Sequence, residues 1–367
     1  MKNIFFLNSS KEWGGGEKWT FETALELDKR GYNVIIGSVK DSELLQMARK
    51  KKIKTKNVPV KGSLSVLNPF KFFAFVKYLR KKKIDVIFLN LSQDLKFGAT
   101  AAKLAGVKKI IYRRGLEIPI KNRFYTKIIF EHCLTDIIAN SHSIKETILR
   151  NTSSWLSGER IKIVYNGIKL DEIEKKRDSK SNIREEFSIK KDIHLMANVG
   201  RLTEQKGHRY LFEALKLVKK EIREFKLLVV GKGELESELM KQVEDLGLSE
   251  NIIFTGFRED VINILDQVDF LVHTALWEGC PNIILEAMAV STPVVATDIS
   301  SVREIVINNE TGYLARTKNP EDIAEKIIKM IRTAEKEKMG QNARRLIETK
   351  FDFREKVTEI EKIFLNS

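Results

Sequence analysis

The chain has 367 residues, of which 43% are hydrophobic; this is enough to fill the cores of two domains of ordinary size and excludes a disordered chain. Its two cysteines, Cys133 and Cys280, lie far apart in the sequence and indicate neither a disulfide framework nor a metal-ligand cluster, so a reducing cytoplasm is the expected location. The first apolar run is too short for a signal peptide, and no run approaches the roughly 20 apolar residues that span a bilayer. A soluble or peripheral protein is therefore expected.

The net charge of +15 is concentrated in the first half of the chain. Residues 1–170 hold 33 Lys/Arg and 14 Asp/Glu, a net charge of +19, whereas residues 171–367 hold 32 and 36, a net charge of −4. Such asymmetry indicates a polyanionic partner, either nucleic acid or an acidic membrane surface. The basic half has no recognisable nucleic-acid-reading motif, so nucleic acid is not the expected partner, although a basic nucleic-acid-binding module stays open as an alternative.

Apolar strands alternate with amphipathic helices along the whole chain, a pattern typical of βαβ units. Strands are predicted in the first half at 2–8, 33–38, 57–60, 84–89, 108–112, 135–139 and 161–164. Strands are predicted in the second half at 194–199, 226–231, 252–254, 269–273, 293–296 and 312–314. A charged stretch interrupts the pattern between them. The sequence therefore predicts two doubly wound α/β domains, followed by a terminal helix: domain 1–170, linker 171–192, domain 193–350 and helical segment 351–367.

The segment 69–83 mixes aromatic and basic residues. An apolar stripe recurs in it at roughly helical spacing, with lysines between its members: Phe70, Phe73, Val76, Tyr78 and Leu79. This is the pattern of a basic amphipathic helix. The favoured interpretation is that the stripe packs on the sheet, with Phe72 and Phe75 as the candidates for exposure; the alternative is that the helix lies on a membrane surface.

The segment Glu278-Gly-Cys-Pro-Asn-Ile-Ile-Leu-Glu286 places two carboxylates eight positions apart. Between them lie a tight turn and the first turn of an apolar helix, formed by Cys280, Pro281, Asn282 and Ile283. Backbone N–H groups at a helix start suit an anionic phosphate, and the flanking carboxylates suit vicinal hydroxyl groups. The segment therefore predicts a site for a nucleotide sugar, with an ordinary loop and two solvated acids as the alternative.

A second candidate site follows the strand at 194–199. This strand ends at Gly200, and two cations follow at Arg201 and Lys206. A strand that leads through a glycine-rich turn into a helix is a phosphate-binding arrangement. Arginine offers a planar fork and lysine a point charge, which together can hold a diphosphate leaving group. In a basic chain, solvated surface cations are the alternative interpretation.

These residues carry a family resemblance. The runs GRLTEQKG, VVGKGELE, FTGF, EGCPNIILEAMA and ATDISSVREIV, in this order and spacing, resemble the nucleotide-binding half of the retaining family 4 glycosyltransferases. The resemblance extends through the first half and covers practically the whole chain, by way of Gly14-Gly-Gly16-Glu17, Ile84-Asp-Val-Ile, Asn140-Ser141 and Val164-Tyr-Asn166-Gly167. It implies the GT-B architecture, in which two Rossmann-like domains face each other across a cleft, the second binding the donor and the first the acceptor.

The resemblance also implies roles for residues of the second half. Glu286 would hold the ribose hydroxyls, Glu278 would contact the donor sugar, and Arg201 and Lys206 would neutralise the departing diphosphate in place of a metal ion. No Asp-x-Asp stands at a strand end, so neither a metal ion nor another cofactor is expected. A nucleotide diphosphate sugar is the expected donor substrate.

Further donor contacts are expected on both halves. Gly15 and Gly16 permit a phosphate or sugar to approach the backbone closely, and Glu17 begins a helix whose N-terminus points there. Gly256 and Phe257 are expected to lie against the nucleobase, with a place in the core as the alternative for Phe257.

One segment departs from the family pattern. Many relatives place a histidine or aspartate after the strand that corresponds to 109–112, whereas this chain has Tyr112-Arg113-Arg114-Gly115-Leu-Glu117. Arg113 and Arg114 are candidates for binding an anionic acceptor or assisting the leaving group, and Glu117 is a candidate for taking the acceptor's proton. Two more solvated cations are the alternative. The five histidines show no ligand spacing, and Cys280 is expected to fill space in its turn.

The sequence thus predicts a metal-independent glycosyltransferase. It would move a hexose-type sugar from a nucleotide diphosphate sugar to a hydroxyl group of a glycan or lipid-linked acceptor, with retention implied by the resemblance. The expected setting is the synthesis of cell-envelope polysaccharide or lipopolysaccharide, in the cytoplasm or bound peripherally to the inner face of the membrane. A non-transferase GT-B enzyme, such as an epimerase, is a further alternative.

Overall fold

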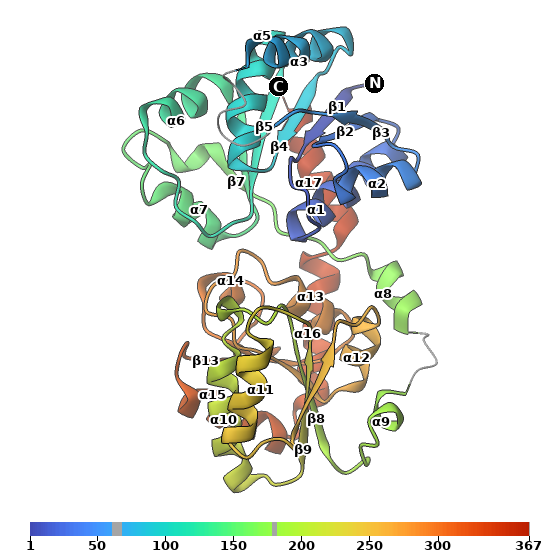
Figure 1. The fold of residues 1–367 in the computed structure, drawn as a ribbon, viewed down its shortest axis with the longest axis vertical. Coiled ribbons are helices and arrows are strands. Elements are labelled where there is room, and N and C mark those ends of the chain that lie inside the picture. Colours follow the sequence, from blue (N-terminus) through green and yellow to red (C-terminus); the bar gives the residue numbers. More distant parts are fainter. Residues whose placement is uncertain (61–67, 178–181, 367) are drawn as a thin grey trace. The chain divides into compact units, whose positions relative to one another are not determined.

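The computed structural model describes residues 1–60, 68–177 and 182–366, and the chain divides into two compact units (Figure 1). Unit 1 combines Met1–Asn166 with the C-terminal segment that begins at Arg354, and unit 2 covers Gly167–Phe353. The segment 171–192, predicted as a linker, contains most of α8 (Leu170–Arg177) and all of α9 (Ile183–Glu186), while residues 178–181 lie outside the described part.

Unit 1 is built on a seven-stranded parallel sheet in the order β3-β2-β1-β4-β5-β6-β7. Its strands are β1 (Asn3–Leu7), β2 (Asn33–Ser38), β3 (Lys54–Asn57), β4 (Val86–Leu89), β5 (Lys109–Arg114), β6 (Asp136–Ala139) and β7 (Ile161–Ile163). Its helices are α1 (Gly15–Lys29), α2 (Glu43–Lys50), α3 (Pro69–Lys81), α4 (Ser92–Asp94), α5 (Thr100–Ala105), α6 (Phe124–Ile128), α7 (His142–Leu149) and α17 (Phe353–Leu365), with π-helical turns at Leu95–Ala99 and Ile129–Cys133 and a 3-10 turn at Gly158–Arg160.

Unit 2 is built on a six-stranded parallel sheet in the order β10-β9-β8-β11-β12-β13. Its strands are β8 (His194–Val199), β9 (Phe225–Val230), β10 (Ile252–Gly256), β11 (Phe270–His273), β12 (Val294–Thr297) and β13 (Gly312–Ala315). After α8 and α9 come the 3-10 turn η5 (Glu204–Lys206), α10 (His208–Glu221), α11 (Glu236–Asp245), α12 (Val261–Gln267), α13 (Asn282–Ala289), α14 (Ser300–Arg303), α15 (Pro320–Arg332) and α16 (Lys336–Lys350). The predicted fold class, two doubly wound parallel sheets, is confirmed.

Both sheets have a topological switch point, where the strand order reverses. It lies between β1 and β4 in unit 1 and between β8 and β11 in unit 2. Ligands of open parallel sheets bind beyond the carboxyl ends of the strands at such points. The two switch points are therefore where functional side chains are expected to gather.

The core of unit 1 forms because successive residues of β1 point to opposite faces of the sheet. The ring of Phe5 packs against Phe75 of α3, with 5.6 Å between the centroids, and the ring of Phe6 packs against Trp19 of α1 at 6.2 Å. Each face of the sheet is therefore covered by helices (Figure 1). Among the described residues, no helix has the length and hydropathy needed to cross a bilayer.

The last helix, α17, packs on unit 1. The ring of its Phe364 lies 5.5 Å from Tyr32 and 6.2 Å from Phe88, measured between centroids. The Nζ atom of Lys2 donates to the carbonyl of Phe364 at 2.7 Å, and Arg30 pairs with Glu361. These aromatic and polar contacts hold the C-terminal segment beside the first strands of the chain.

The third strand differs from its prediction. It covers Lys54–Asn57 rather than 57–60, and it is the edge strand beside β2. The apolar residues that suggest a strand at 57–60 lie just after it, where Val58 and Val60 are buried in the core. Pro59 between them has no N–H group to donate to a ladder, so the polar segment before them forms the strand instead.

In helix α3 the phenylalanines that are buried are not the ones that the sequence pattern predicts to be buried. Phe70 and Phe73 are 86% and 61% exposed, and the buried face consists of Phe72, Phe75, Val76 and Leu79. These four residues have the i, i+3, i+4, i+7 spacing of one helical face. Phe70 and Phe73 lie on the neighbouring face, together with Ala74 and Lys77. The prediction that Phe70 and Phe73 pack on the sheet is therefore wrong.

Candidate active site

An ion pair between Lys206 and Glu278 lies at the switch point of unit 2. The Nζ atom of Lys206 donates to the Oε1 atom of Glu278, and the two side chains are only 19% and 13% exposed. The Nε2 atom of His273, the last residue of β11, lies 3.8 Å from the same carboxylate oxygen. A cation, an anion and a buried imidazole therefore meet beyond the carboxyl ends of β8 and β11.

Backbone contacts fix the turn that carries Lys206. The N–H group of Leu276 donates to the carbonyl of Gln205 at 2.8 Å, and the hydroxyl of Thr274 donates to the carbonyl of Lys206 at 3.1 Å. Gly207 has a φ of +66°, and a Cβ atom there would lie 2.2 Å from the carbonyl oxygen of Thr274. Only glycine permits this approach, so the loops after β8 and β11 hold the ion pair in one arrangement.

Glycines also bring the ends of β8 and β9 together. Gly231 has a φ of +144°, and a Cβ atom there would lie 1.9 Å from the carbonyl oxygen of Gly200. A Cβ atom at Gly200 would lie 3.1 Å from the Cε atom of Lys206. Gly200, a predicted donor-binding residue, thus leaves room for the lysine side chain to cross it and reach Glu278.

The segment between Glu278 and Glu286 forms the entry to α13. Cys280 is half-buried and Pro281 is the N-cap residue, so the helix begins at Asn282 and Ile283 without a capping side chain. Glu286 lies in the second turn and is half-buried.

Two further predicted donor residues of unit 2, Arg201 and Phe257, are exposed. Arg201 forms no ion pair within the described ranges. Phe257 is 70% exposed, so the alternative that it belongs to the core is wrong. It follows Gly256, which has a φ of +69° at the end of β10.

Two histidines beside the ion pair are not predicted as site residues. His208 follows Gly207 at the start of α10, and burial together with the nearby Lys206 lowers the pKa of His208 to about 4. The pKa of His273 is also well below its ordinary value, mainly because the imidazole is buried and to a lesser extent because Lys206 and His208 are near it. Both imidazoles are therefore neutral at physiological pH. His208 lies two positions after Lys206 in the sequence, which is a weak signal that it belongs to the site. Nothing in the sequence links His273 to Lys206.

In unit 1, the predicted Gly15, Gly16 and Glu17 form the first turn of α1. Gly15 is exposed, and a Cβ atom at Gly16 would have no atom within 4 Å, so packing inside the unit does not require glycine there. Glu17 is buried. The glycine at position 16 therefore leaves open space at the carboxyl end of the sheet.

Arg113 and Arg114 are both buried, so the alternative that they are solvated cations is wrong. They are consecutive in β5 and point to opposite faces of the sheet. Arg113 lies 4.6 Å from the ring of Trp19 and donates to Asn166 at 2.9 Å. Arg114 donates to the hydroxyl of Tyr112 at 2.9 Å. The strand therefore separates the two cations and gives them different surroundings.

Glu117 accepts a hydrogen bond from the hydroxyl of Ser143 at 2.7 Å and is half-buried. This contact lies within unit 1, after the end of β5. In the described part of the chain, no group of three His, Cys, Asp or Glu side chains is arranged to hold a metal ion.

Two family models match nearly the whole chain between them. The model of Glycosyltransferase Family 4 matches residues 13–172, and the model of Glycosyl transferases group 1 matches residues 179–346. The chain belongs to glycosyltransferase family 4. Its fold is that of the GT-B glycosyltransferases: the structure of Anabaena HepE in complex with UDP and glucose aligns with a TM-score of 0.85 at 22% identity, covering 100% of both chains.

Two relatives of this glycosyltransferase are similar over most of their length. The UDP-Gal:alpha-D-GlcNAc-diphosphoundecaprenol alpha-1,3-galactosyltransferase of Escherichia coli is 25% identical over 319 residues, which are 83% of this chain and 81% of the relative. The capsular polysaccharide biosynthesis glycosyltransferase CapM of Staphylococcus aureus is 26% identical over 323 residues, which are 84% and 83% of the two chains.

A buried carboxyl group of this glycosyltransferase is not predicted from its sequence. Asp94 follows β4 and accepts from the backbone N–H groups of Ser9 at 3.2 Å and Leu91 at 3.0 Å. Burial raises the pKa of Asp94 to about 7; the hydrogen bonds from Ser9 and Leu91 oppose this shift, and the nearby Glu17 adds to it. Two acids therefore share the switch point of unit 1, and Asp94 is partly protonated near neutral pH.

Asp94 is expected to make folding stability depend on pH. Because its folded-state pKa, about 7, lies above the unfolded value of 3.8, the folded chain retains a proton that the unfolded chain releases, and the free energy of unfolding falls as pH rises through this range. Asp94→Asn cannot ionise. Relative to the unmodified chain, its free energy of unfolding should rise by roughly 1 kcal/mol per pH unit between pH 4 and 7. Urea unfolding at pH 5 and pH 8 measures this; an equal difference at both pH values would contradict it.

Proposed function

We propose that this family 4 glycosyltransferase moves a hexose-type sugar from a nucleotide diphosphate sugar to a hydroxyl group of a glycan or lipid-linked acceptor. The reaction retains the anomeric configuration, needs no metal ion, and serves the synthesis of a cell-envelope polysaccharide. The observation that carries the proposal is the ion pair of Lys206 and Glu278 beside the neutral His273, at the switch point of unit 2. The names of the two relatives support it, since one acts on a diphosphoundecaprenol-linked sugar and the other belongs to capsular polysaccharide biosynthesis.

The ion pair suggests how the donor is engaged. Without donor, Lys206 and Glu278 neutralise each other in a place that is largely shielded from water. A bound donor replaces this pair with two new ones, in which Lys206 contacts the diphosphate and Glu278 accepts from hydroxyls of the sugar. The exposed Arg201 supplies a second cation to the diphosphate. Charges that are already held in place when the bond to the sugar breaks stabilise the transition state without reorganisation.

Other residues bind the rest of the nucleotide in this proposal. Glu286 accepts hydrogen bonds from the two ribose hydroxyls, because a carboxylate has enough lone pairs to receive both. Phe257 is a large aromatic side chain held out in solvent after Gly256, and it stacks on the base. The uridine nucleotides named for HepE and the Escherichia coli relative make UDP-sugars the first donors to test.

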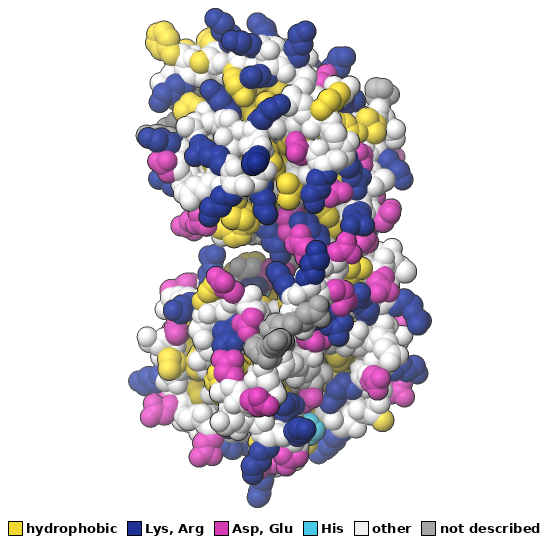
Figure 2. Space-filling model, turned by 90° about the vertical axis from the view of Figure 1, so that its right-hand side faces the viewer, with side chains coloured by type: hydrophobic (Ala, Val, Ile, Leu, Met, Phe, Trp, Pro, Cys, Tyr) yellow, Lys and Arg dark blue, Asp and Glu magenta, His cyan; other side chains and the backbone are white. Residues whose placement is uncertain are grey.

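A membrane-bound acceptor fits the surface of unit 1. Lys and Arg side chains spread over this unit on the face drawn in Figure 2. On α3 the exposed Phe70 and Phe73 accompany Lys71, Lys77 and Lys81, all of them exposed. Near an anionic leaflet each such cation contributes about 1 kcal/mol, and the aromatic rings add apolar contact. We therefore place the enzyme peripherally on the cytoplasmic face of the membrane.

Ligand-induced stabilisation of the full chain tests the proposed donor class. UDP, GDP, ADP and their sugars are added in a thermal-unfolding assay, and one nucleotide family is expected to raise the midpoint, since a ligand at 100 times its Kd adds about 2.7 kcal/mol to stability. A radiolabelled sugar should then appear on lipid-linked glycan extracted from membranes.

Three outcomes count against the proposal. No stabilisation by any nucleotide diphosphate or its sugar, together with retention on heparin that nucleotide sugars do not alter, favours a nucleic-acid-binding protein instead. Conversion of the sugar while it stays on the nucleotide favours an epimerase. A requirement for added divalent metal in a chelator-treated assay contradicts the metal-independent mechanism.

A further inference from the structure

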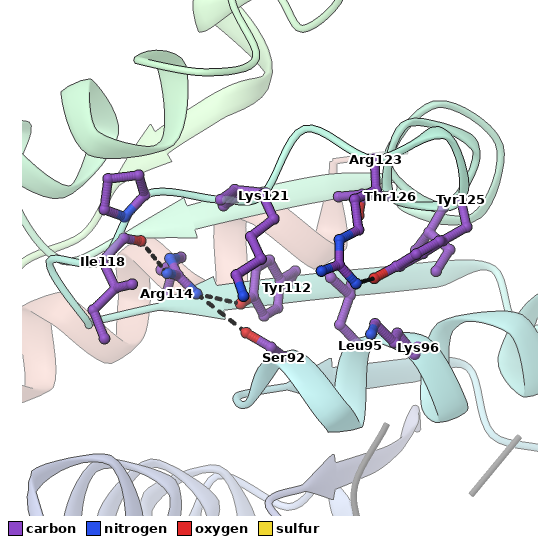
Figure 3. A pocket seen from close by; sticks show the side chains of 13 residues that line it. Ser92, Leu95, Lys96, Tyr112, Arg114, Ile118, Lys121, Arg123, Tyr125 and Thr126 are labelled. Atoms are coloured by element: carbon purple, nitrogen blue, oxygen red, sulfur yellow. Dashed lines mark hydrogen bonds between the residues drawn. The ribbon is translucent and has the colours of Figure 1, made fainter. Parts of the chain in front are cut away.

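A cation-lined pocket opens in unit 1 at the carboxyl end of β5 (Figure 3). Its volume is about 290 Å³, at the lower end of the range for small-molecule sites. Its walls come from the end of β5, from α4 and the π-helical turn that follows it, and from the segment 118–129, which includes α6. All of these belong to unit 1, so the pocket is distinct from the ion pair of unit 2.

Four cations line this pocket: Lys96, Arg114, Lys121 and Arg123. Within residues 1–60, 68–177 and 182–366, no carboxylate pairs with any of them. Elsewhere many basic side chains of this chain have an acidic partner, such as Lys109 with Asp136. The pocket therefore holds an excess of positive charge that the described part of the protein does not neutralise.

Arg114 is the most telling of the four, because it is only 6% exposed. Its guanidinium donates to neutral acceptors, the hydroxyls of Tyr112 at 2.9 Å and Ser92 at 3.5 Å and the carbonyl of Ile118. Its Nε atom is buried without a hydrogen-bond partner. A buried guanidinium that lacks both a counter-charge and one hydrogen bond is costly, and an anion bound in the pocket would remove that cost.

Two other cations converge on Tyr125. The Nζ atom of Lys96 lies 4.6 Å from the centre of its ring, and Arg123 donates to its hydroxyl at 3.1 Å. Lys96 and Arg123 together lower the pKa of Tyr125. Lys121 points toward the hydroxyl of Tyr112 in the view of Figure 3. The positive groups thus line a common space, which they share with Tyr112 and Tyr125.

The same pocket has apolar walls and an apolar rim. Leu95, Ile120 and Ile129 are buried in its lining. Ile118 at its edge and Phe124 in the adjoining α6 are exposed large apolar side chains. A nucleotide or a free sugar has no hydrocarbon chain to cover such a rim. An anion attached to a hydrocarbon chain would use both the cations and the apolar surface.

We propose that this pocket binds the phosphate or diphosphate group of an amphiphilic lipid, with its hydrocarbon chain along Ile118 and Phe124. The inference rests on the proposed function, in which the acceptor is a lipid-linked glycan, and it names the part of the acceptor that unit 1 recognises. Arg114 contacts the phosphate from the floor of the pocket, and Lys96, Lys121 and Arg123 contact it from the sides. The glycan then extends away from an anchored phosphate.

Farnesyl diphosphate is a suitable probe, with inorganic pyrophosphate and farnesol as its two halves. Calorimetric titration uses the full chain with UDP in saturating amount, so that the donor's diphosphate site is filled. Farnesyl diphosphate is expected to bind more tightly than either half. The double variant Lys96→Gln/Arg123→Gln should weaken its binding at least 10-fold, while Lys103→Gln/Lys108→Gln, which removes two exposed cations outside the pocket, should not. Arg114→Gln should weaken it further if the variant keeps the unfolding midpoint.

Further measurements distinguish a phosphate that belongs to the lipid-linked acceptor from one that belongs to a bulk phospholipid. With a lipid-diphosphate-linked glycan as acceptor, Lys96→Gln/Arg123→Gln should raise the acceptor KM about 10-fold without changing nucleotide-induced stabilisation. With the same glycan on a phosphate-free alkyl chain, KM should not change. Unaltered farnesyl diphosphate binding in the double variant overturns the proposal. The proposal is also overturned if the double variant loses binding only to phosphatidylglycerol vesicles and keeps binding to farnesyl diphosphate, because the pocket would then be a site for bulk phospholipid. If the unmodified chain does not bind any nucleotide, this result would instead refute the proposed transferase function.

Discussion

Replacing Lys206 with alanine is expected to lower kcat for sugar transfer by about 10²–10³-fold while the protein stays folded. In the proposed mechanism Lys206 faces the negative charge that grows on the diphosphate as the bond to the sugar breaks. Removing one preorganised electrostatic donor from an active site typically costs this much in kcat. Because the interaction strengthens toward the transition state, kcat should fall more than the donor KM rises. Steady-state kinetics with saturating acceptor measures both.

A matched control exists in the same unit. Lys326 of α15 is 22% exposed and lies 3.6 Å from Asp322, so it resembles Lys206 in burial and in having an acidic partner. Lys326→Ala should leave kcat unchanged. Lys206→Arg keeps the positive charge and should recover part of the lost activity, although its fork does not reproduce a point charge. Near-normal kcat in Lys206→Ala would remove this residue from the mechanism.

Replacing Glu286 with glutamine is expected to weaken donor binding by about 10–100-fold, with a smaller effect on kcat. Glutamine keeps the size of the side chain but removes its charge, and a hydrogen bond to a charged group contributes about 1.5–3 kcal/mol. The contact is to the ribose, which does not react, so the loss should appear mainly in the donor KM. Glu325→Gln, an exposed acid on α15, serves as the control and should not alter donor binding.

Deoxynucleotides make this test specific for the ribose. In the unmodified chain, 2′-deoxy-UDP should bind less tightly than UDP, because one hydroxyl that donates to Glu286 is missing. In Glu286→Gln the two nucleotides should differ much less. The two changes thus form a double-mutant cycle whose coupling energy reports the contact itself. Independent effects of the variant and the missing hydroxyl would place Glu286 away from the ribose.

Much of the fold can be predicted from local patterns. Thirteen strands are predicted, and the described residues form thirteen, because strands that are buried on both faces of a parallel sheet have short apolar runs as their sequences. The one clear shift, in β3, concerns an edge strand whose residues are polar. The position of such a strand depends on the strand beside it. Pairing with β2 places β3 at Lys54–Asn57, and the apolar Val58 and Val60 that follow it are buried in the core.

Burial decides between faces that a sequence leaves equivalent. In α3 four phenylalanines fall within six residues, so apolar stripes on adjacent faces overlap in the pattern. Contact with Phe5 of β1 and Phe97 selects the face of Phe75 and leaves Phe70 and Phe73 in solvent. A periodicity gives the existence of a helix, whereas the rotation of that helix depends on what it meets.

The sequence by itself determined the family and marked the residues that are proposed to bind the donor, because glycines, cations and acids at fixed spacing follow the carboxyl ends of apolar strands. Tertiary structure alone decided which of these residues meet. Lys206 and Glu278 are 72 positions apart, and the parallel order of β8 and β11 joins them beside a histidine that no motif marks. The same holds in unit 1, where the fold buries Arg114 without an ion pair to any acid among the described residues and gathers Lys96, Lys121 and Arg123 around one pocket. Charge and chain spacing are local properties, whereas desolvation and counter-charge depend on every neighbour that the fold supplies.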